Sequence, residues 1–270
     1  MSKQFITIDN KHKISYKIYG NGENTIIFLH GLIGSSWISP EWKKGIDEAN
    51  VNLIVLDRIG HGGSSQFEME NVGNWISIIK QIVKELNINN ADVIGLSAGA
   101  PYAYASAYAL PNVIKKIWIL SGVPAVYEDS IIKHYSKESQ TIYKSFIEKT
   151  VSEIQEYYVN QLKGALEHLK EGGEDYIVKT IEEALNQNCY GMALESKLQI
   201  LPWKLQLSDI QQPIVMYHAK EDEMVPFIPA KEMCLQFFQN CTFKEMMTTG
   251  KDVHIKSCSY AFLELLCEYK

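Results

Sequence analysis

The amino-acid sequence predicts an α/β protein in which a doubly wound, mostly parallel sheet is interrupted by a helical insertion. Two observations support this fold class. Short runs that are apolar at almost every position, such as residues 25–29 and 51–56, alternate with segments of helical periodicity. This alternation stops at Pro124 and resumes at Pro213. Repetition of strand, loop and helix is typical of a parallel sheet that carries helices on both faces.

Each expected strand is a short run that ends in a loop. The first two strands are separated by a turn over residues 9–12, and we expect them to form a hairpin. The later strands are apolar on both faces, as in the centre of a parallel sheet. The expected strands are residues 5–8, 13–19, 25–29, 51–56, 91–94, 114–122, 213–218 and 242–246.

The expected helices have apolar residues three and four positions apart. Between the strands they cover residues near 40–49, 72–87, 100–110, 229–239 and 256–269. In the insertion they cover residues 127–149, 152–170, 174–187 and a shorter stretch near 191–201. We therefore expect an α/β core of residues 1–124 and 209–270, and a helical cap or lid of residues 125–208.

Composition indicates a globular protein, and the use of cysteine is typical of the cytoplasm. The 270 residues are 46% hydrophobic and 21% charged, with a net charge of -6, which argues against a nucleic-acid partner because no basic face is available. We expect no signal peptide, and no apolar run approaches the roughly 20 residues of a membrane span. Five cysteines without metal-ligand spacing predict free thiols, and neither a metal nor a cofactor is expected.

The pentapeptide Gly95-Leu96-Ser97-Ala98-Gly99 carries the strongest chemical signal. It lies between a predicted strand and a predicted helix, the context in which G-x-S-x-G presents a nucleophilic serine on a sharp turn. Gly95 and Gly99 leave room where a side chain would collide with the neighbouring strand and helix. By itself the motif is equally compatible with a plain glycine-rich turn. However, the loops after residues 29, 56, 94 and 120 are all expected at the same edge of the sheet, where ligands bind.

A serine hydroxyl becomes an effective nucleophile when a base takes its proton, and histidine is the usual base. In proteins with this kind of turn, the acid and then the histidine follow the serine along the chain. Of the seven histidines, only His254 follows a late strand in a predicted loop and in that order. The others lie before Ser97, in the insertion or inside a strand (His12, His30, His61, His134, His168 and His218).

The acid is less narrowly determined than the base. Glu221, Asp222 and Glu223 are adjacent after a predicted strand, so any one of them could face the site. We favour Asp222, because Pro226 restricts the loop that would aim its side chain. Asp252 is too close to His254 in sequence, and we expect it to be a loop residue.

An oxyanion that forms during acyl transfer needs hydrogen-bond donors. We expect one donor to be the backbone N–H of Ala98, directly after the serine. The other is expected in the loop His30-Gly31-Leu32, where Gly31 allows the backbone to turn so that the N–H of Leu32 points inward. His30 is then a scaffold residue that holds the loop, not a base.

These segments together resemble the α/β-hydrolase-fold superfamily, in particular its lid-bearing esterase- and lipase-like serine hydrolases. The resemblance implies an eight-stranded sheet, Ser97 as nucleophile, Asp222 as acid and His254 as base. It also implies an oxyanion hole at Leu32 and Ala98. The segments that carry it are His30–Leu32, Asp57–Ser64, Gly95–Gly99, Asp222 with Val225 and Pro226, and Gly250 with His254.

Two features of this resemblance concern the loops. In the superfamily the glycine-rich loop that corresponds to residues 57–64 is mainly structural, so we expect neither Asp57 nor His61 to be catalytic. The superfamily more often has a glycine beside the catalytic histidine, whereas here Gly250 stands four positions before His254.

The expected activity is hydrolysis of a small-molecule carboxylic ester, thioester or lactone through an acyl-enzyme. Tyrosines and aliphatic residues in the insertion favour a hydrophobic acyl group. A serine at the turn argues against haloalkane dehalogenases and epoxide hydrolases, which resemble this fold but use an aspartate there. A C–C bond hydrolase, an amide or peptide hydrolase, an acyltransferase and a non-catalytic ligand receptor remain open, as does the oligomeric state.

Overall fold

Eight strands form one sheet in the order β1-β2-β4-β3-β5-β6-β7-β8. The structure is a computed structural model that describes residues 2–169 and 174–270. Strands β1 and β2 are antiparallel to their neighbours, and the other six are parallel, which confirms the predicted mostly parallel sheet. The strands are β1 (Gln4–Ile8), β2 (His12–Gly20), β3 (Asn24–Leu29), β4 (Val51–Leu56), β5 (Ala91–Leu96), β6 (Ile114–Leu120), β7 (Ile214–Ala219) and β8 (Cys241–Met246).

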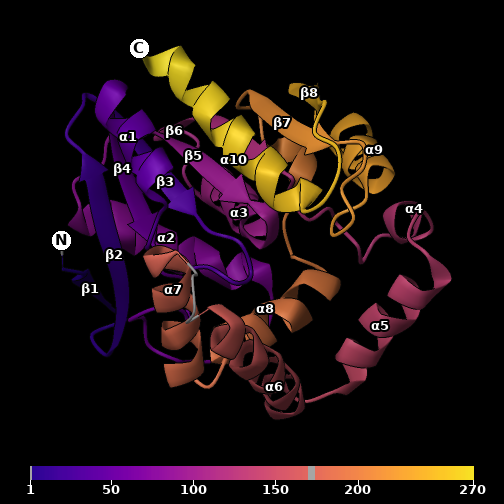
Figure 1. The fold of residues 1–270 in the computed structure, drawn as a ribbon. Coiled ribbons are helices and arrows are strands. Elements are labelled where there is room, and N and C mark those ends of the chain that lie inside the picture. The colour runs from indigo at the N-terminus through magenta and orange to yellow at the C-terminus, as the bar shows by residue number, and fades with distance from the viewer. Residues whose placement is uncertain (1, 170–173) are drawn as a thin grey trace.

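Helices cover both faces of this sheet, as a doubly wound fold requires (Figure 1). One face packs against α1 (Pro40–Glu48) and α10 (Val253–Leu266). The other packs against α2 (Trp75–Glu85), α3 (Ala100–Ala109) and α9 (Phe227–Phe237). The two hydrophobic cores therefore lie on opposite sides of the sheet.

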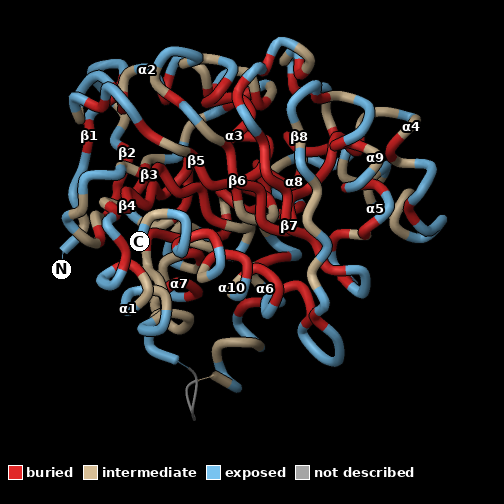
Figure 2. Tube along the Cα trace, turned by 90° about the horizontal axis from the view of Figure 1, so that it is seen from above, coloured by how far each residue is buried: buried red, intermediate tan, exposed pale blue. Residues whose placement is uncertain are grey.

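Strand β3 shows how the sequence fills both cores. Ile27 and Leu29 pack on the side of α2 and α3, whereas Ile26 and Phe28 pack on the side of α1 and α10. Side chains of a strand alternate between its faces, so a strand between two helical layers must be apolar at every position. Each such buried side chain stabilises the fold by about 1.5–3 kcal/mol. Figure 2 shows the buried residues concentrated along these central strands.

The segment between β6 and β7 is helical, and it lies beyond the carboxyl ends of the parallel strands (Figure 1). Within it, α8 is buried over almost its whole length, from Gly191 to Ile200, whereas α5 has no fully buried residue. Helix α8 is thus the inner helix and α5 an outer one. These inserted helices are α4 (Asp129–Ile132), α5 (Lys137–Glu148), α6 (Val151–Leu169), α7 (Asp175–Asn186) and α8 (Tyr190–Ile200).

Two helix predictions need correction. The helix expected over residues 127–149 is divided into α4 and α5, because the Ser136 hydroxyl accepts a hydrogen bond from the N–H of Ser139 and starts a new helix. The last helix begins at Val253 and not near residue 256. The expected end of the 152–170 helix lies outside the described residues. Among the helices that are described, none is long and apolar enough to cross a bilayer.

The close contact between the Ser97 turn and β3 predicts that a single methyl group added at Gly99 destabilises the fold. A Cβ at Gly99 would lie 2.1 Å from the carbonyl oxygen of Leu29 and 2.7 Å from that of His30. Since both neighbours are backbone atoms that cannot yield, Gly99→Ala should lower the free energy of unfolding by about 2 kcal/mol or more. Urea denaturation measures this change.

The matched control is Gly164→Ala, in the exposed part of α6, where a Cβ meets nothing within 4 Å. This substitution should raise the free energy of unfolding by about 0.5–1 kcal/mol, because alanine is the better helix former. Equal effects of the two substitutions would contradict the close packing at Gly99.

Candidate active site

Ser97 lies on a sharp turn between β5 and α3, at the start of a short 3₁₀ segment (Ser97–Gly99). Its φ of 50° is in the left-handed region, which costs a non-glycine residue about 1–3 kcal/mol and marks a backbone conformation held by its surroundings. A Cβ at Gly95 would lie 2.7 Å from the Cα of Ala100, so glycine is required on this side of the turn too. The Ser97 side chain is half-buried and therefore accessible.

The loop after β3 lies directly beside this serine. A Cβ at Gly31 would lie 3.1 Å from Leu96 Cδ2 and 3.6 Å from Ser97 Cβ. Among the described residues, no loop or side-chain hydrogen bond uses the N–H of Leu32. Ala98 follows the serine at the start of the helical segment, where N–H groups have no partner within the helix. The N–H groups of Leu32 and Ala98, which follow Gly31 and Ser97 in the chain, are therefore candidate donors for a group bound at Ser97.

Asp222 and His254 form a buried hydrogen-bonded pair. His254 Nδ1 lies 2.8 Å and 3.0 Å from the two carboxylate oxygens of Asp222. Oxygen Oδ1 also accepts hydrogen bonds from the N–H groups of Met224 (3.0 Å) and Val225 (2.8 Å), which fix the carboxylate in place. A carboxylate at Nδ1 holds the proton on that nitrogen and leaves Nε2 free to act as a base.

The Asp222 carboxyl group stays ionised although it is buried. Burial raises its pKa, but the hydrogen bond and charge of His254, with the N–H of Val225, outweigh burial and lower the pKa below its ordinary value. Glu221 and Glu223 are exposed on either side of it. Of the three carboxylates that the sequence leaves open, the structure brings Asp222 to His254.

His218 in β7 supports the acid loop, a contact that the sequence reasoning missed. Its Nε2 donates to the carbonyl oxygen of Val225 at 2.7 Å and lies 3.6 Å from Asp222 Oδ2. Burial lowers the pKa of His218, so it is neutral at pH 7. In the sequence, this contact is indicated only by the spacing, because His218 stands four residues before Asp222.

His254 lies in the first turn of α10 and not in a loop as expected. Asp252, just before the helix, has a φ of 57°, so a left-handed residue redirects the chain after Gly250. The Ser257 hydroxyl donates to the His254 carbonyl oxygen and lies 3.0 Å from the Ser121 hydroxyl oxygen.

The segment after β6 links the base to the nucleophile, because Val123, two residues beyond Ser121, donates its N–H to the Ser97 carbonyl oxygen. Within the part of the chain that the structure describes, no hydrogen bond joins the side chains of Ser97 and His254. The structure thus forms two groups of predicted site residues. Ser97 and Ala98 lie with the loop that carries Leu32, and Asp222 lies with His254. Their catalytic roles stay predictions.

His30 is buried in the loop beside Ser97. Its Nδ1 donates to the Gly31 carbonyl oxygen at 2.7 Å, and its Nε2 faces the N–H of Arg58 at 3.4 Å. Burial and the charge of Arg58 lower the pKa of His30 well below its ordinary value. A neutral imidazole that hydrogen-bonds its own loop fits the expected scaffold role.

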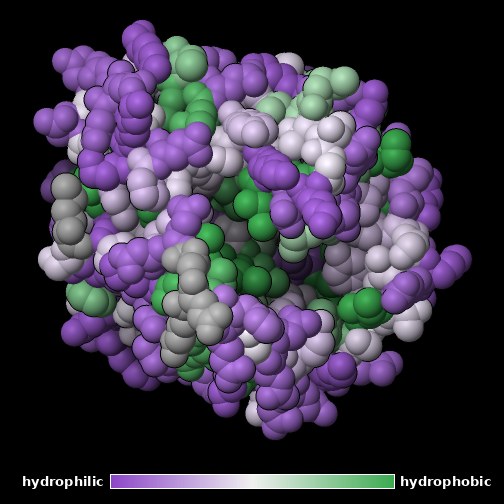
Figure 3. Space-filling model, viewed as in Figure 1, coloured by the Kyte–Doolittle hydropathy of each residue, from purple (hydrophilic) through white to green (hydrophobic). Residues whose placement is uncertain are grey.

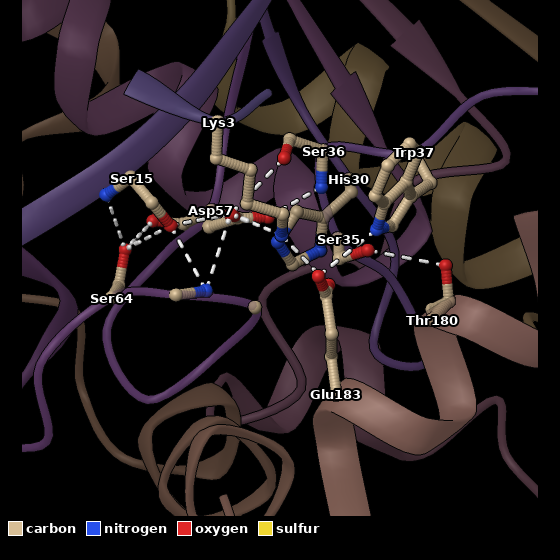
Figure 4. Close-up of polar contacts among 12 residues, drawn as sticks. Lys3, Ser15, His30, Ser35, Ser36, Trp37, Asp57, Ser64, Thr180 and Glu183 are labelled. Carbon is tan, nitrogen blue, oxygen red and sulfur yellow. Dashed lines mark hydrogen bonds and ion pairs between the residues drawn. The ribbon is translucent and has the colours of Figure 1, made fainter. Parts of the chain in front are cut away.

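Asp57 is enclosed by donors from several parts of the chain (Figure 4). It accepts from the Ser15 hydroxyl at 2.5 Å, from the N–H of Ser36 and from Lys3 Nζ at 2.7 Å. Lys3 also lies 2.7 Å from Glu183 in α7. This carboxylate has the partners of a structural brace between the sheet and the inserted helices, in line with the expected role of residues 57–64.

Figure 3 shows a hollow between α10 and the inserted helices in which hydrophobic residues gather. A cavity of about 410 Å³ opens beside the acid; its lining includes His134, Asp222, Phe227 and Ile228. Exposed apolar side chains lie near the acid and the base in sequence: Met224, Ile228, Met247 and Ile255. Among the described residues, no group of three or more His, Cys, Asp or Glu side chains could hold a metal ion.

Comparison with known proteins identifies the family of this chain. A profile of the alpha/beta hydrolase fold matches residues 24–254, which include the turn at Ser97, Asp222 and His254. The chain belongs to the alpha/beta hydrolase fold family. Its eight-stranded, mostly parallel sheet agrees with this fold.

Individual relatives of this alpha/beta hydrolase are distant. The non-heme haloperoxidase of Rhodococcus erythropolis is 22% identical over 251 residues, 89% of each chain. Ethanol acetyltransferase 1 of Cyberlindnera fabianii is 25% identical over 118 residues, 43% of this chain and only 35% of that protein, so the match spans about a third of its length. The structure of an esterase from Exiguobacterium antarcticum has a TM-score of 0.75 with 17% identity and 99% coverage of both chains, a likeness of fold.

The low pKa of Asp222 predicts how stability changes with pH. An aspartate has a pKa of about 3.9 in the unfolded chain, so a lower folded value stabilises the protein above that pH. This contribution is lost as the pH falls through the folded pKa. Asp222→Asn should therefore cost about 1–3 kcal/mol at pH 7. The difference from wild type should shrink as the solution is acidified below about pH 4.

Urea denaturation at a series of pH values measures this difference. The control is Ser257→Ala, which removes a buried hydrogen bond of the same region but no titrating group. Its difference from wild type should not vary with pH. A difference for Asp222→Asn that does not shrink below about pH 4 would contradict the assigned pKa direction.

Proposed function

We propose that this alpha/beta hydrolase is a serine hydrolase that cleaves small-molecule carboxylic esters, thioesters or lactones through an acyl-enzyme. The observation that carries the proposal is the buried Asp222–His254 pair, which lies at the same sheet edge as a serine held in a left-handed turn. This is the set of groups that nucleophilic acyl transfer requires, in the chain order of this fold. We also propose that it acts in the cytoplasm.

In the proposed mechanism His254 Nε2 takes the proton of the Ser97 hydroxyl while the serine oxygen attacks the substrate carbonyl carbon. The N–H groups of Leu32 and Ala98 donate to the oxyanion that forms. The imidazolium then protonates the leaving alcohol, and the C–O bond to it breaks. Water, deprotonated by His254, attacks the acyl-serine and releases the acid. Asp222 stays ionised throughout and stabilises the imidazolium.

The substrate that the site fits best has a hydrophobic acyl group. The hollow between α10 and the inserted helices is lined by hydrophobic residues (Figure 3). Within the insertion, Tyr135 lies between α4 and α5 and packs against Tyr143 of α5, with ring centroids 5.5 Å apart. Exposed Met224 and Ile255 flank the acid and the base. We propose that residues 125–208 form a cap over this pocket and select the acyl group.

An acyltransferase is the second candidate, and the partial match to ethanol acetyltransferase 1 of Cyberlindnera fabianii favours it. Both activities share the acyl-enzyme and differ in whether water or an alcohol accepts the acyl group. Amide and C–C bond hydrolysis and ligand reception without turnover have no specific observation in their favour. Epoxide hydrolysis is disfavoured, since the residue at the turn is Ser97 and not an aspartate.

Ser97→Ala should lower kcat for p-nitrophenyl esters by about 10⁴-fold or more, because no other group can form the acyl-enzyme. The same variant should lose covalent labelling by a fluorophosphonate probe. Ser77→Ala, an exposed hydroxyl on α2, is the control and should retain both. Labelling that persists in Ser97→Ala would refute the assignment of the nucleophile.

A series of p-nitrophenyl esters of rising chain length tests the acyl pocket. We expect kcat/KM to rise with each added methylene by up to about fourfold, the value of about 0.8 kcal/mol per buried CH₂, until the pocket is full. Addition of ethanol separates the two candidates. Ethyl ester as the main product would indicate an acyltransferase, whereas free acid indicates a hydrolase. Uniformly slow turnover across the series would contradict both.

A further inference from the structure

A buried ion pair connects the inserted helices to the loop beside Ser97. Arg58 follows β4, and Glu195 lies on α8, 137 residues later. The guanidinium binds the carboxylate through two hydrogen bonds, Nε to Oε1 at 2.5 Å and Nη2 to Oε2 at 2.7 Å. The two side chains are only 1% and 2% exposed. This is the forked geometry in which arginine and a carboxylate fix each other's orientation.

The same guanidinium holds the backbone of the loop after β3. Nη1 of Arg58 donates to the His30 carbonyl oxygen at 2.5 Å, and Nη2 lies 3.4 Å from the Gly31 carbonyl oxygen. The Gly31 carbonyl oxygen also accepts from His30 Nδ1 at 2.7 Å, so Arg58 holds this peptide together with a residue whose own carbonyl it binds. The Gly31 carbonyl belongs to the same peptide unit as the N–H of Leu32. In a trans peptide the C=O and the N–H point in opposite directions, so a donor that fixes one also aims the other.

We propose that Glu195 is a positioning residue: through Arg58 it orients the Gly31–Leu32 peptide so that the Leu32 N–H donates to the substrate oxyanion. The inference rests on the proposed acyl transfer. It makes the oxyanion site depend on the docking of α8, because Glu195 comes from that helix and Arg58 from the sheet edge. Neither residue is predicted to touch the substrate.

Charge and packing around the pair support a geometric role. Burial raises the pKa of Glu195, but the charge and the hydrogen bonds of Arg58 outweigh burial and lower it, so the carboxylate is ionised. The Arg58 guanidinium also lies over the Tyr102 ring, 4.9 Å from its centroid. With one face on an aromatic ring and its edge on Glu195, the guanidinium has a single orientation toward the carbonyls.

A buried ion pair is weak evidence for stability, because desolvation offsets the attraction between the charges. Replacement of both partners by apolar residues of similar volume often leaves stability unchanged. A structural role and a positioning role therefore make different predictions for the double variant Arg58→Met/Glu195→Met.

The first experiment compares Glu195→Gln with wild type on a p-nitrophenyl ester. We expect kcat to fall by about 10²-fold, the loss typical of one oxyanion donor, with KM nearly unchanged. The affinity for a trifluoromethyl ketone, which forms a tetrahedral oxyanion with the serine, should fall by a similar factor. Glu183→Gln in α7 is the matched control: it removes another ion pair between the inserted helices and the rest of the chain, with Lys3, and should leave both values unchanged.

The double variant separates positioning from folding. We expect its urea midpoint to match that of wild type, while kcat and ketone affinity stay as low as in Glu195→Gln. Recovery of kcat along with stability would overturn the proposal, because the pair would then act only through folding. Unchanged kcat and ketone affinity in a folded Glu195→Gln would overturn it too.

Failure of the proposed function gives a different result. If the ketone and the fluorophosphonate react equally with wild type and Ser97→Ala, the acyl-transfer assignment is wrong, whatever Glu195 does. If both reagents require Ser97 but ignore Glu195, only the positioning role is wrong.

Discussion

The backbone contact between the Ser97 turn and the end of β3 constrains the whole candidate site. Gly99 lies so close to the carbonyl oxygens of Leu29 and His30 that no side chain fits between them. This contact fixes the serine and the loop with Gly31 and Leu32 as one unit. A strained φ at Ser97 persists because the parallel pairing of β3 with β5 and the packing of α3 over-determine it.

Three buried carboxylates near this unit have different environments and therefore different uses. Asp222 accepts from an imidazole and two backbone N–H groups, which keeps it ionised beside a potential base. Asp57 is enclosed by hydroxyl, backbone and lysine donors and braces the sheet edge. Glu195 is paired with Arg58. Since a buried carboxylate needs partners to remain charged, the set of partners determines what each can do.

The inserted helices contribute to the site unequally. Helix α8 is buried between the sheet edge and the other inserted helices, and it reaches the loop that holds Gly31 and Leu32 through Glu195 and Arg58. Helix α5 has no fully buried residue and lies farther out. A forked ion pair therefore fixes α8 to the sheet edge, whereas α5 lies nearer the surface.

The sequence alone determined the sheet and its helical layers, and it predicted Ser97 as the nucleophile and His254 as the base. These depend on local patterns: apolar runs, helical periodicity, G-x-S-x-G between strand and helix, and the order of elements along the chain. It left the choice among Glu221, Asp222 and Glu223 open, because three adjacent residues have the same local context and only the position of His254 separates them. It joined α4 and α5 into one helix, since the apolar spacing continues past the cap at Ser136.

The pairing of Arg58 with Glu195 could be decided only by the tertiary structure. Arg58 and Glu195 are 137 residues apart in the sequence, and no local pattern encodes a contact that exists only when α8 docks on the sheet edge.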